Sequence, residues 1–400
     1  MTALSVDRRD DLPLILIAYV SFMILGFPGA MLGVLTPAIR QSFGLSLDTI
    51  GQYFLAYSVG YVISSAMSGR LTAHFRTGIL LTMSCLLTAG ALLGIATAPS
   101  WTAIVLFAGL LGAANAVQDA GMNIVFAARF NARLMNWLHA SFGLGALLAP
   151  LLATWLLQAG IDWRFAYFGV VGLYLLVVLL FFLTIDRWTI TRSREAAAAV
   201  RDSSLLRTLR LPFVWVGIGL FFIMAGLEAA TGQWAPSLLS EGRGIDAVTA
   251  GYWTTAYWAS FTIGRIFFGA VDFQLSAQAL VRAMATLGIG GALLLWWSPA
   301  DIFDLVALII IGFALAPMFA VLVTHTQKTL GDRHGSNAIG IQMAAASLGV
   351  GTIPWVAGVA ANAAGLDAIA IVVVALFVLL TLLVLFLGRV GRMFAASGGR

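Results

Sequence analysis

Long apolar runs, separated by short polar segments, make up almost the whole chain. An α-helix needs about 20 apolar residues to cross a bilayer. Twelve such runs lie near residues 12–36, 49–69, 78–97, 102–127, 136–159, 164–185, 211–240, 248–270, 277–298, 302–327, 335–363 and 366–389. The pattern predicts an all-α membrane protein with twelve transmembrane helices in two pseudo-symmetric six-helix bundles.

The composition excludes the main soluble alternatives. Of the 400 residues, 61% are hydrophobic and 10% are charged, against roughly 25% charged in an ordinary soluble domain. So few charges cannot cover the surface of a soluble globule of this size. A soluble enzyme, a nucleic-acid-binding protein and a disordered chain are therefore excluded. The single cysteine, Cys85, allows no disulfide within the chain.

The N-terminal segment predicts a retained first span. Residues 1–11 are polar, and the apolar run after them is longer than the 7–15 residues of a signal-peptide core. We expect an N-terminal bundle over residues 1–185, a cytoplasmic linker over 186–210 and a C-terminal bundle over 211–400. Within the linker, residues 195–200 are expected to form a short helix on the membrane surface.

Basic residues are distributed unevenly between the two sides of this topology. With both termini on one side, that side collects eighteen of the 22 Lys and Arg residues and the other collects three. The three are Arg40, Arg164 and Arg243, while Arg265 lies inside a helix. Because basic loops stay in the cytoplasm, both termini are predicted to be cytoplasmic, in a multi-pass protein of the cell inner membrane.

Two short echoes relate the halves. At an offset of 200 residues, the stretch 50–69 shares Gly, Ala, Tyr, Ile and Gly with the stretch 250–269. The fifth span contains Gly143-x-Gly145 before Pro150, and the eleventh contains Gly349-x-Gly351 before Pro354. Small residues let helices approach closely. Parallel six-helix repeats are typical of secondary transporters whose substrate site lies between the halves near the bilayer midplane.

Three polar residues are spaced by four in the fourth span. Asn115, Asp119 and Asn123 are expected on one helix face, with Gln118 beside them. Intramembrane carboxylates are costly and usually functional. An apolar environment favours the protonated form of a carboxyl group, which suits a proton carrier. We therefore expect Asp119 to couple to protons and the amides to bind solute. The alternative is a polar seam that joins two helices.

Other spans carry candidates with equally plain structural alternatives. Glu228 is a second site for a proton or a ligand, or else a structural hydrogen-bonding group. Arg265 is a gate or a substrate clamp, or else a side chain that extends to the cytoplasmic surface. His139 either relays protons near neutral pH or is a solvated or core-bonded histidine near the cytoplasmic end. Polar and aromatic side chains are the remaining candidates for solute contact, or else packing groups: Asn136, Trp234, Tyr257 and Gln342.

Motifs for covalent chemistry are missing from the sequence. It contains no HExxH, GxSxG or P-loop pattern and no Cys/His cluster with metal-ligand spacing. We therefore expect no enzyme activity, cofactor or metal, and transport energy from an ion gradient.

Over essentially the whole chain, the pattern resembles the major facilitator superfamily, and more narrowly its fucose permease-like branch. The narrower resemblance lies in Asp119-x-x-x-Asn123, in Asn136 with His139, and in Gly226-x-Glu228-x-x-x-Gly232-x-Trp234. A further similar stretch is Ala316-Pro317-Met318-Phe319. The superfamily motif between the second and third helices departs here, with Ala73 and His74 in place of its Asp and Arg.

The resemblance implies alternating access between two bundles. We expect proton-coupled symport of a small polar solute, sugar-like or polyol-like, with sodium as the other possible coupling ion, by a monomer. An efflux antiporter for an amphipathic compound is the first alternative. A membrane sensor without transport activity and a membrane-embedded enzyme are the others.

Overall fold

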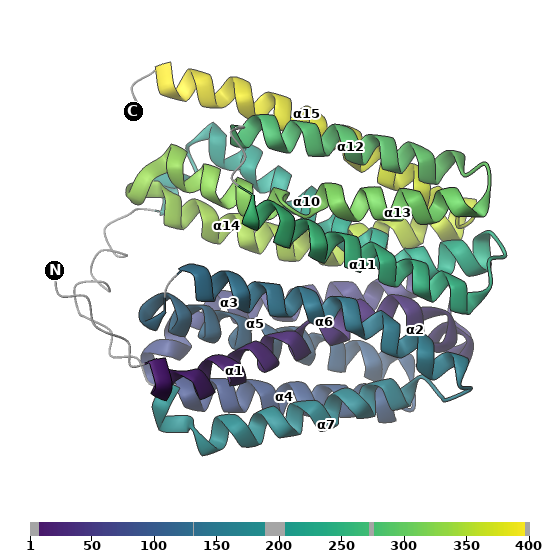
Figure 1. Ribbon diagram of the computed structural model, residues 1–400, viewed down its shortest axis with the longest axis horizontal. Helices are drawn as coiled ribbons and strands as arrows, with labels where there is room; N and C mark the ends of the chain where they lie inside the picture. The colour runs from purple at the N-terminus through teal and green to yellow at the C-terminus, as the bar shows by residue number, and fades with distance from the viewer. Residues whose placement is uncertain (1–7, 131, 189–204, 272–275, 397–400) are drawn as a thin grey trace.

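The computed structural model describes residues 8–130, 132–188, 205–271 and 276–396. In these ranges the chain is helical throughout, apart from short connections, and forms two bundles that lie side by side (Figure 1). The first bundle contains α1 (Arg8–Leu25), α2 (Phe27–Phe43), α3 (Gly51–His74), α4 (Thr77–Thr97), α5 (Trp101–Arg129), α6 (Ala132–Gln158) and α7 (Arg164–Leu183). The second contains α10 (Pro212–Ser237), α11 (Ala247–Ala270), α12 (Ala277–Trp297), α13 (Asp301–Leu315), α14 (Met318–Ala364) and α15 (Ala368–Ala396).

Short helical turns complete the described chain: η1 (Asp48–Ile50), η2 (Ile185–Trp188), α9 (Leu205–Thr208) and the π-helical turn η3 (Leu238–Gly242). The expected surface helix over residues 195–200 lies outside the described residues, as does most of the linker. The start of α1 and the end of α15 lie at the same end of the molecule (Figure 1), as an even number of crossings requires. We call this the terminal end and the opposite one the outer end.

Ten segments in the described ranges are long and apolar enough to cross a membrane. The predicted second and eighth spans correspond to α3 and α11, which are not among the ten although each has 24 residues. Both contact the opposite bundle through α14 and α6 respectively. Both are thus spans with one side against the other bundle, where less hydropathy is needed than against lipid.

The first predicted span continues further than residue 36 and has a break. Gly26 separates α1 from α2, with Pro28 in the first turn of α2. A Cβ at Gly26 would collide with the Phe142 carbonyl of α6. Proline at the start of a helix loses no hydrogen bond, so the chain restarts without cost and reaches Phe43. The break therefore lies where the first span packs closely against α6.

The tenth and eleventh predicted spans are joined differently from the expectation. The tenth is divided between α13 and the first part of α14, at Ala316 and Pro317. Gly331 then adopts a positive φ of 61° inside α14, which marks the turn between the tenth and eleventh spans. Only glycine takes this backbone conformation readily. The predicted separation near residues 327–335 is thus present, built on one glycine.

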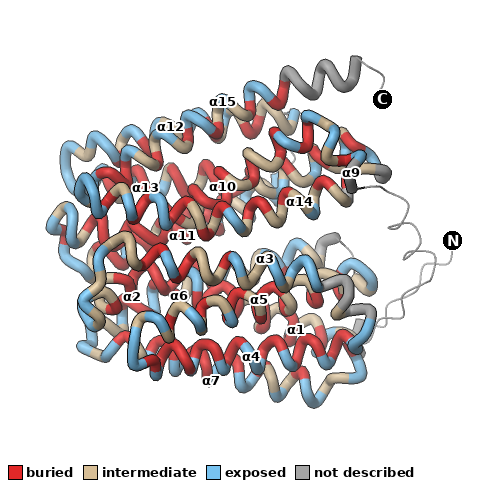
Figure 2. The backbone as a smooth tube through the Cα atoms, turned by 180° about the vertical axis from the view of Figure 1, so that it is seen from behind, coloured by how far each residue is buried: buried red, intermediate tan, exposed pale blue. Residues whose placement is uncertain are grey.

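Equivalent helices pack in equivalent ways in the two bundles. Contacts of α3 with α5, α4 with α7 and α1 with α6 correspond to those of α11 with α13, α12 with α15 and α10 with α14. Between the bundles, α2 contacts α10, α3 contacts α14, and α6 contacts α11. The buried residues follow these contacts, while the outward faces of the helices are exposed (Figure 2). Exposed leucines and phenylalanines on those faces suit contact with lipid.

In each of the two glycine pairs of the echo, one glycine contacts its own bundle and the other contacts the opposite bundle. Gly145 lies directly against the Met23 carbonyl of α1, and Gly349 against the Phe222 carbonyl of α10, each within its own bundle. The other glycine of each pair faces the opposite bundle, Gly143 at Thr262 and Gly351 at Ser58. Close helix contact at such positions requires a residue without a side chain. Gly145 and Gly349, each five residues before its proline, therefore lie at equivalent crossings within their bundles, whereas the glycines that face the opposite bundle lie on opposite sides of them in sequence.

Candidate functional site

A chain of hydrogen bonds runs through Asp119 where the two bundles face each other. The Tyr61 hydroxyl of α3 donates to Oδ2 of Asp119 at 2.6 Å, and Nδ2 of Asn123 donates to Oδ1 at 2.8 Å. His139 Nε2 of α6 lies 3.1 Å from Oδ1 of Asn123. Both oxygens of Asp119 are thus engaged, and the carboxyl group is linked through an amide to a titratable ring.

The four groups of this chain are accessible to different degrees. Asp119, Asn123 and Tyr61 are half-buried and His139 is exposed. Phe22 packs its ring edge against the His139 ring at 5.7 Å. A carboxyl group that keeps contact with solvent, beside a histidine, can exchange protons with one side of the membrane.

Tyr61 belongs to this hydrogen-bonded chain but is not among the site residues predicted from the sequence. Its signal was present, however, since Tyr57 and Tyr61 are spaced by four, like Asn115 and Asp119. In the structure the two stripes meet, because Asn115 Nδ2 donates to the Tyr57 hydroxyl at 3.1 Å.

Asn115 and Gln118 lie deeper in the bundle. Asn115 is 2% exposed and also accepts a hydrogen bond from Thr88 at 3.2 Å. Gln118 is fully buried and donates to the Ser21 hydroxyl at 2.8 Å. Their hydrogen-bonding groups are therefore occupied by α1, α3 and α4. In this structure the two predicted solute ligands connect helices of the first bundle by hydrogen bonds.

The second bundle contributes an arginine and a carboxylate. Arg265 of α11 and Glu228 of α10 approach to 3.9 Å, with side chains 28% and 20% exposed. The Arg265 guanidinium lies over the Phe261 ring, 4.1 Å from its centre. Tyr257 donates to the backbone carbonyl of Glu228 at 2.9 Å. Arg265 lies within electrostatic range of His139, so titratable groups from both bundles face one another.

Three other predicted solute ligands are buried among protein groups. Trp234 donates to the Pro354 carbonyl at 2.8 Å, and Tyr257 is fully buried against Glu228. Gln342 is fully buried against Gly217 of α10, and its amide has no hydrogen-bond partner among the described residues. Asn136 lies one turn before His139 and is exposed. In this conformation only Asn136 of these four is accessible to a solute.

The bundles touch on the outer side of these groups. Thr262 donates to the Gly143 carbonyl at 3.0 Å, and Gln233 donates to the Gly29 carbonyl at 2.5 Å. Further out, Arg40 of α2 makes two hydrogen bonds to Glu241 of η3, at 3.0 and 2.7 Å. These contacts close the outer end of the interface between the bundles.

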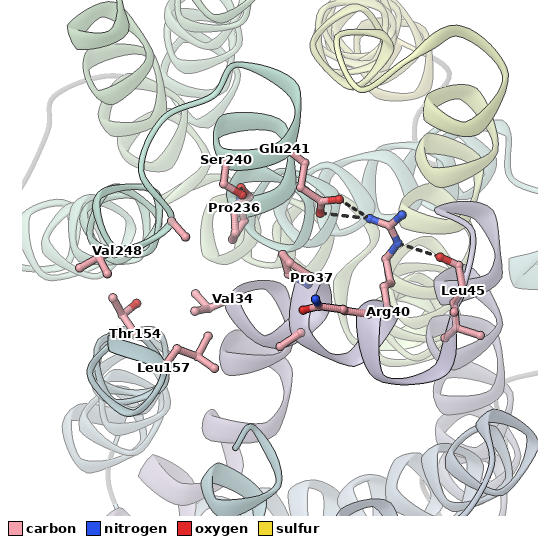
Figure 3. Close-up of a pocket in the computed structure, with 14 residues that line it drawn as sticks. Val34, Pro37, Arg40, Leu45, Thr154, Leu157, Pro236, Ser240, Glu241 and Val248 are labelled. Atoms are coloured by element: carbon pink, nitrogen blue, oxygen red, sulfur yellow. Dashed lines mark hydrogen bonds and ion pairs between the residues drawn. The ribbon is translucent and has the colours of Figure 1, made fainter. Parts of the chain in front are cut away.

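A pocket of about 610 Å³ lies beside this outer ion pair (Figure 3). Its walls come from the ends of α2, α6 and α10 and from the start of α11, with Pro37, Thr154, Pro236 and Val248 among them. It contains neither Asp119 nor Arg265. The pocket is therefore an outer vestibule, separate from the central polar groups. Across the described ranges, no three His, Cys, Asp or Glu side chains are arranged to hold a metal ion.

Comparisons with known proteins agree with this architecture. The family model described as Major Facilitator Superfamily matches residues 18–338. The chain is 24% identical to Bypass of stop codon protein 6 of Saccharomyces cerevisiae, over 88% of this chain and 78% of that protein. It is 23% identical to the glucose/mannose transporter GlcP of Bacillus subtilis, over 87% and 88%.

A crystal structure of a D-xylose-proton symporter superposes with a TM-score of 0.75 at 14% identity, over 92% of this chain and 96% of that one. At that identity the likeness shows the fold. The resemblance predicted from the sequence is thus confirmed at the level of the superfamily, together with the helical membrane fold. This chain belongs to the major facilitator superfamily and is a membrane transporter, not an enzyme.

Proposed function

We propose that this transporter is a symporter that couples uptake of a small polar solute, sugar-like or polyol-like, to protons. The observation that carries the proposal is the chain Tyr61–Asp119–Asn123–His139, which holds a carboxyl group between the bundles. Asp119 is the main protonation site, and His139 passes protons between it and solvent. Similarity to a glucose/mannose transporter in sequence and to a D-xylose-proton symporter in fold supports the solute class and the coupling ion.

The solute lies between the two bundles. Asn123 and Asn136 supply accessible amides for hydrogen bonds to hydroxyl groups. Glu228 is either a second proton site or a ligand for the solute, and Arg265 is the gate or clamp beside it. Because Asn115, Gln118, Trp234, Tyr257 and Gln342 are buried, they shape the walls in this conformation instead of contacting the solute.

Alternating access follows from movement of two units, residues 1–185 and 211–400, joined by the linker 186–210. Both termini face the cytoplasm of a cell with the protein in its inner membrane, as the distribution of basic residues favours. The outer end is then the extracytoplasmic end. The contacts that close it, Arg40 with Glu241 among them, must separate for a solute to enter from outside.

Proton coupling supplies enough energy for accumulation. One proton moving down a membrane potential of about 100 mV releases about 2.3 kcal/mol, equivalent to roughly a fiftyfold solute gradient. A single carboxyl group that binds and releases one proton per cycle is therefore sufficient.

The test uses purified protein in liposomes that contain a pH-sensitive dye, with an inside-negative potential and no sodium. Hexoses, deoxyhexoses, polyols and sugar acids are added in turn. We expect solute-dependent internal acidification and accumulation. Asp119→Asn is expected to lose potential-driven accumulation while retaining exchange of labelled for unlabelled solute.

Asp162→Asn is the matched control, because Asp162 is an exposed carboxylate in the outer loop between α6 and α7. It is expected to behave like the wild type. Accumulation by Asp119→Asn at the wild-type level would contradict the proposed role. Acidification that requires sodium, or that appears only when an amphipathic compound leaves the liposome, would contradict proton symport itself.

A further inference from the structure

Arg265 is an internal arginine whose hydrogen-bonding capacity is unused. A guanidinium group has five N–H donors, and a charge at this depth in a membrane is costly unless it is paired. Its Nη2 atom lies 3.9 Å from Oε2 of Glu228, beyond hydrogen-bonding distance. In the described part of the chain, Arg265 makes no hydrogen bond, and its plane rests on the Phe261 ring at 4.1 Å.

The outer arginines provide an internal comparison. Arg40 donates to Glu241 and to the Leu45 carbonyl. Arg243 donates to Asp304, Asp367 and the Leu295 carbonyl. Their side chains are 17% and 12% exposed, less than the 28% of Arg265. Of the three, the more accessible Arg265 is the one whose donors stay open among the described residues, which points to a ligand from solution that binds there.

The Glu228 carboxylate also lacks hydrogen-bond partners among the described residues. Tyr257 bonds its backbone carbonyl, and its carboxylate accepts no hydrogen bond from the described residues. Two opposite charges held 3.9 Å apart, both partly exposed, leave room for a group that displaces one of them. A carboxylate is the group whose geometry matches the planar fork of an arginine.

We propose that Arg265 binds a carboxylate of the transported solute, so that the solute is a hydroxylated organic acid, and that Glu228 takes up a proton when the solute displaces it from Arg265. This inference rests on the proposed proton symport and names its substrate class. Hydroxyl groups of the same solute reach the amides of Asn123 and Asn136. A sugar acid has the required combination of one carboxylate and several hydroxyls.

The charge balance follows from the groups around Glu228. Those that face it are the guanidinium of Arg265 and the phenol of Tyr257, both from α11. Helices α2, α13, α14 and α15 also pack against α10, but their described residues present no charge to this carboxylate. His139 of α6 faces Arg265 and Asp119. Once a solute anion occupies Arg265, Glu228 loses the one cation that the described residues present to it and is neutralised by a proton.

The stoichiometry can be written out. One solute anion enters with one proton on Glu228 and one on Asp119, so a net charge of +1 moves inward. On release, the solute leaves Arg265, Glu228 gives up its proton to the cytoplasm and pairs with Arg265 again. Without the Glu228 carboxyl group, one solute anion and one proton move inward per cycle, so no net charge crosses the membrane.

The experiment compares D-gluconate and D-glucuronate with their neutral counterparts D-glucitol and D-glucose, in the same dye-loaded liposomes. We expect only the two acids to acidify the interior and to raise the melting temperature of the detergent-solubilised protein. Arg265→Lys keeps the charge but loses the fork, so its KM for the acid is expected to rise at least tenfold. Glu228→Gln is expected to lower the proton-to-solute ratio by one and to abolish the dependence of uptake on potential.

Arg164→Gln is the matched control, because Arg164 also stacks on an aromatic ring, that of Trp163 at 4.4 Å, but at the outer surface. It is expected to leave both readouts unchanged. Each Arg265 and Glu228 variant must first show the wild-type melting temperature without ligand. If Arg265→Lys has a lower melting temperature, Arg265→Gln serves as the second variant.

Proton uptake driven by the neutral sugars would overturn the inference and leave the proposed symport standing. A panel in which neither acid stabilises the protein nor acidifies the interior would also overturn it. An unchanged proton-to-solute ratio in Glu228→Gln would remove Glu228 from the proton path. By contrast, proton flux with no solute at all would contradict the proposed function itself.

Discussion

At the scale of single residues, the polar side chains of the membrane helices fall into two kinds. Gln118 and Asn115 are buried and bonded to neighbouring helices, whereas Asp119 and Asn123 are half-buried and face the other bundle. The first kind stabilises a bundle and the second kind is available for transport. Polarity alone does not separate them, because both occur on one helix within nine residues.

Gln118→Ala tests this division. The substitution removes a buried hydrogen bond to Ser21 and leaves the serine hydroxyl without its partner, which costs about 1–3 kcal/mol. We expect a lower melting temperature in detergent with an unchanged KM for the solute. Asn123→Ala is the companion variant and should show the opposite, a raised KM with a melting temperature near that of the wild type. A raised KM for Gln118→Ala would place that side chain at the solute.

Much of the candidate site could be predicted from residue spacing. The interval of four between Asp119 and Asn123 places both on one face of α5, and their mutual hydrogen bond confirms it. The spacing of Tyr57 and Tyr61 places both on one face of α3, but it does not show that this face packs against Asp119, because the rotation of α3 is set by its packing. The same applies to Gln342, which is polar but turned against Gly217 inside the second bundle.

At the scale of elements, the predicted helices match the observed ones, and the differences lie at their breaks. Hydropathy detects where the chain is apolar, so it places α4 and α12 within a residue or two of their observed ends. It does not detect the interruption at Gly26 or at Pro317, because both lie inside apolar runs. These breaks depend on contact with another helix, which is a property of the assembled bundle.

Gly349→Ala tests the helix crossing between α14 and α10. A Cβ at this position would collide with the Phe222 backbone, and overpacking of this kind costs about 1–3 kcal/mol. We expect a lower melting temperature and more aggregation on size-exclusion chromatography. Gly340→Ala on the same helix is the control, because a Cβ there meets open space, and alanine favours a helix by up to about 1 kcal/mol. Equal stability of the two variants would argue against the close crossing.

At the scale of the whole molecule, the ion pair of Arg40 with Glu241 joins the bundles at the outer end. A pair this accessible is worth about 1 kcal/mol or less, enough to change the ratio of closed to open molecules by at most about fivefold. We expect Arg40→Glu and Glu241→Arg each to shift the protein toward the outward-open state. The double exchange should restore the wild-type ratio.

The reporter for this shift is Ser58→Cys. Ser58 is 2% exposed and packs against Gly351 of the other bundle, so a membrane-impermeant thiol reagent added outside reaches it only when the outer end opens. The native Cys85 is fully buried and contributes little background. Faster labelling in either single variant and normal labelling in the exchanged pair are the expected results. Equal rates in all four proteins would show that the ion pair does not influence opening.

The position of this ion pair also bears on the symmetry between the two halves. Arg40 and Glu241 are 201 residues apart, one more than the offset that relates the two halves, so they occupy nearly equivalent places. Two identical six-helix units meeting about a two-fold axis would bring the same residue to both places. Like charges there would repel and hold the outer end apart. The attraction that closes it therefore requires two halves that differ in sequence at these places.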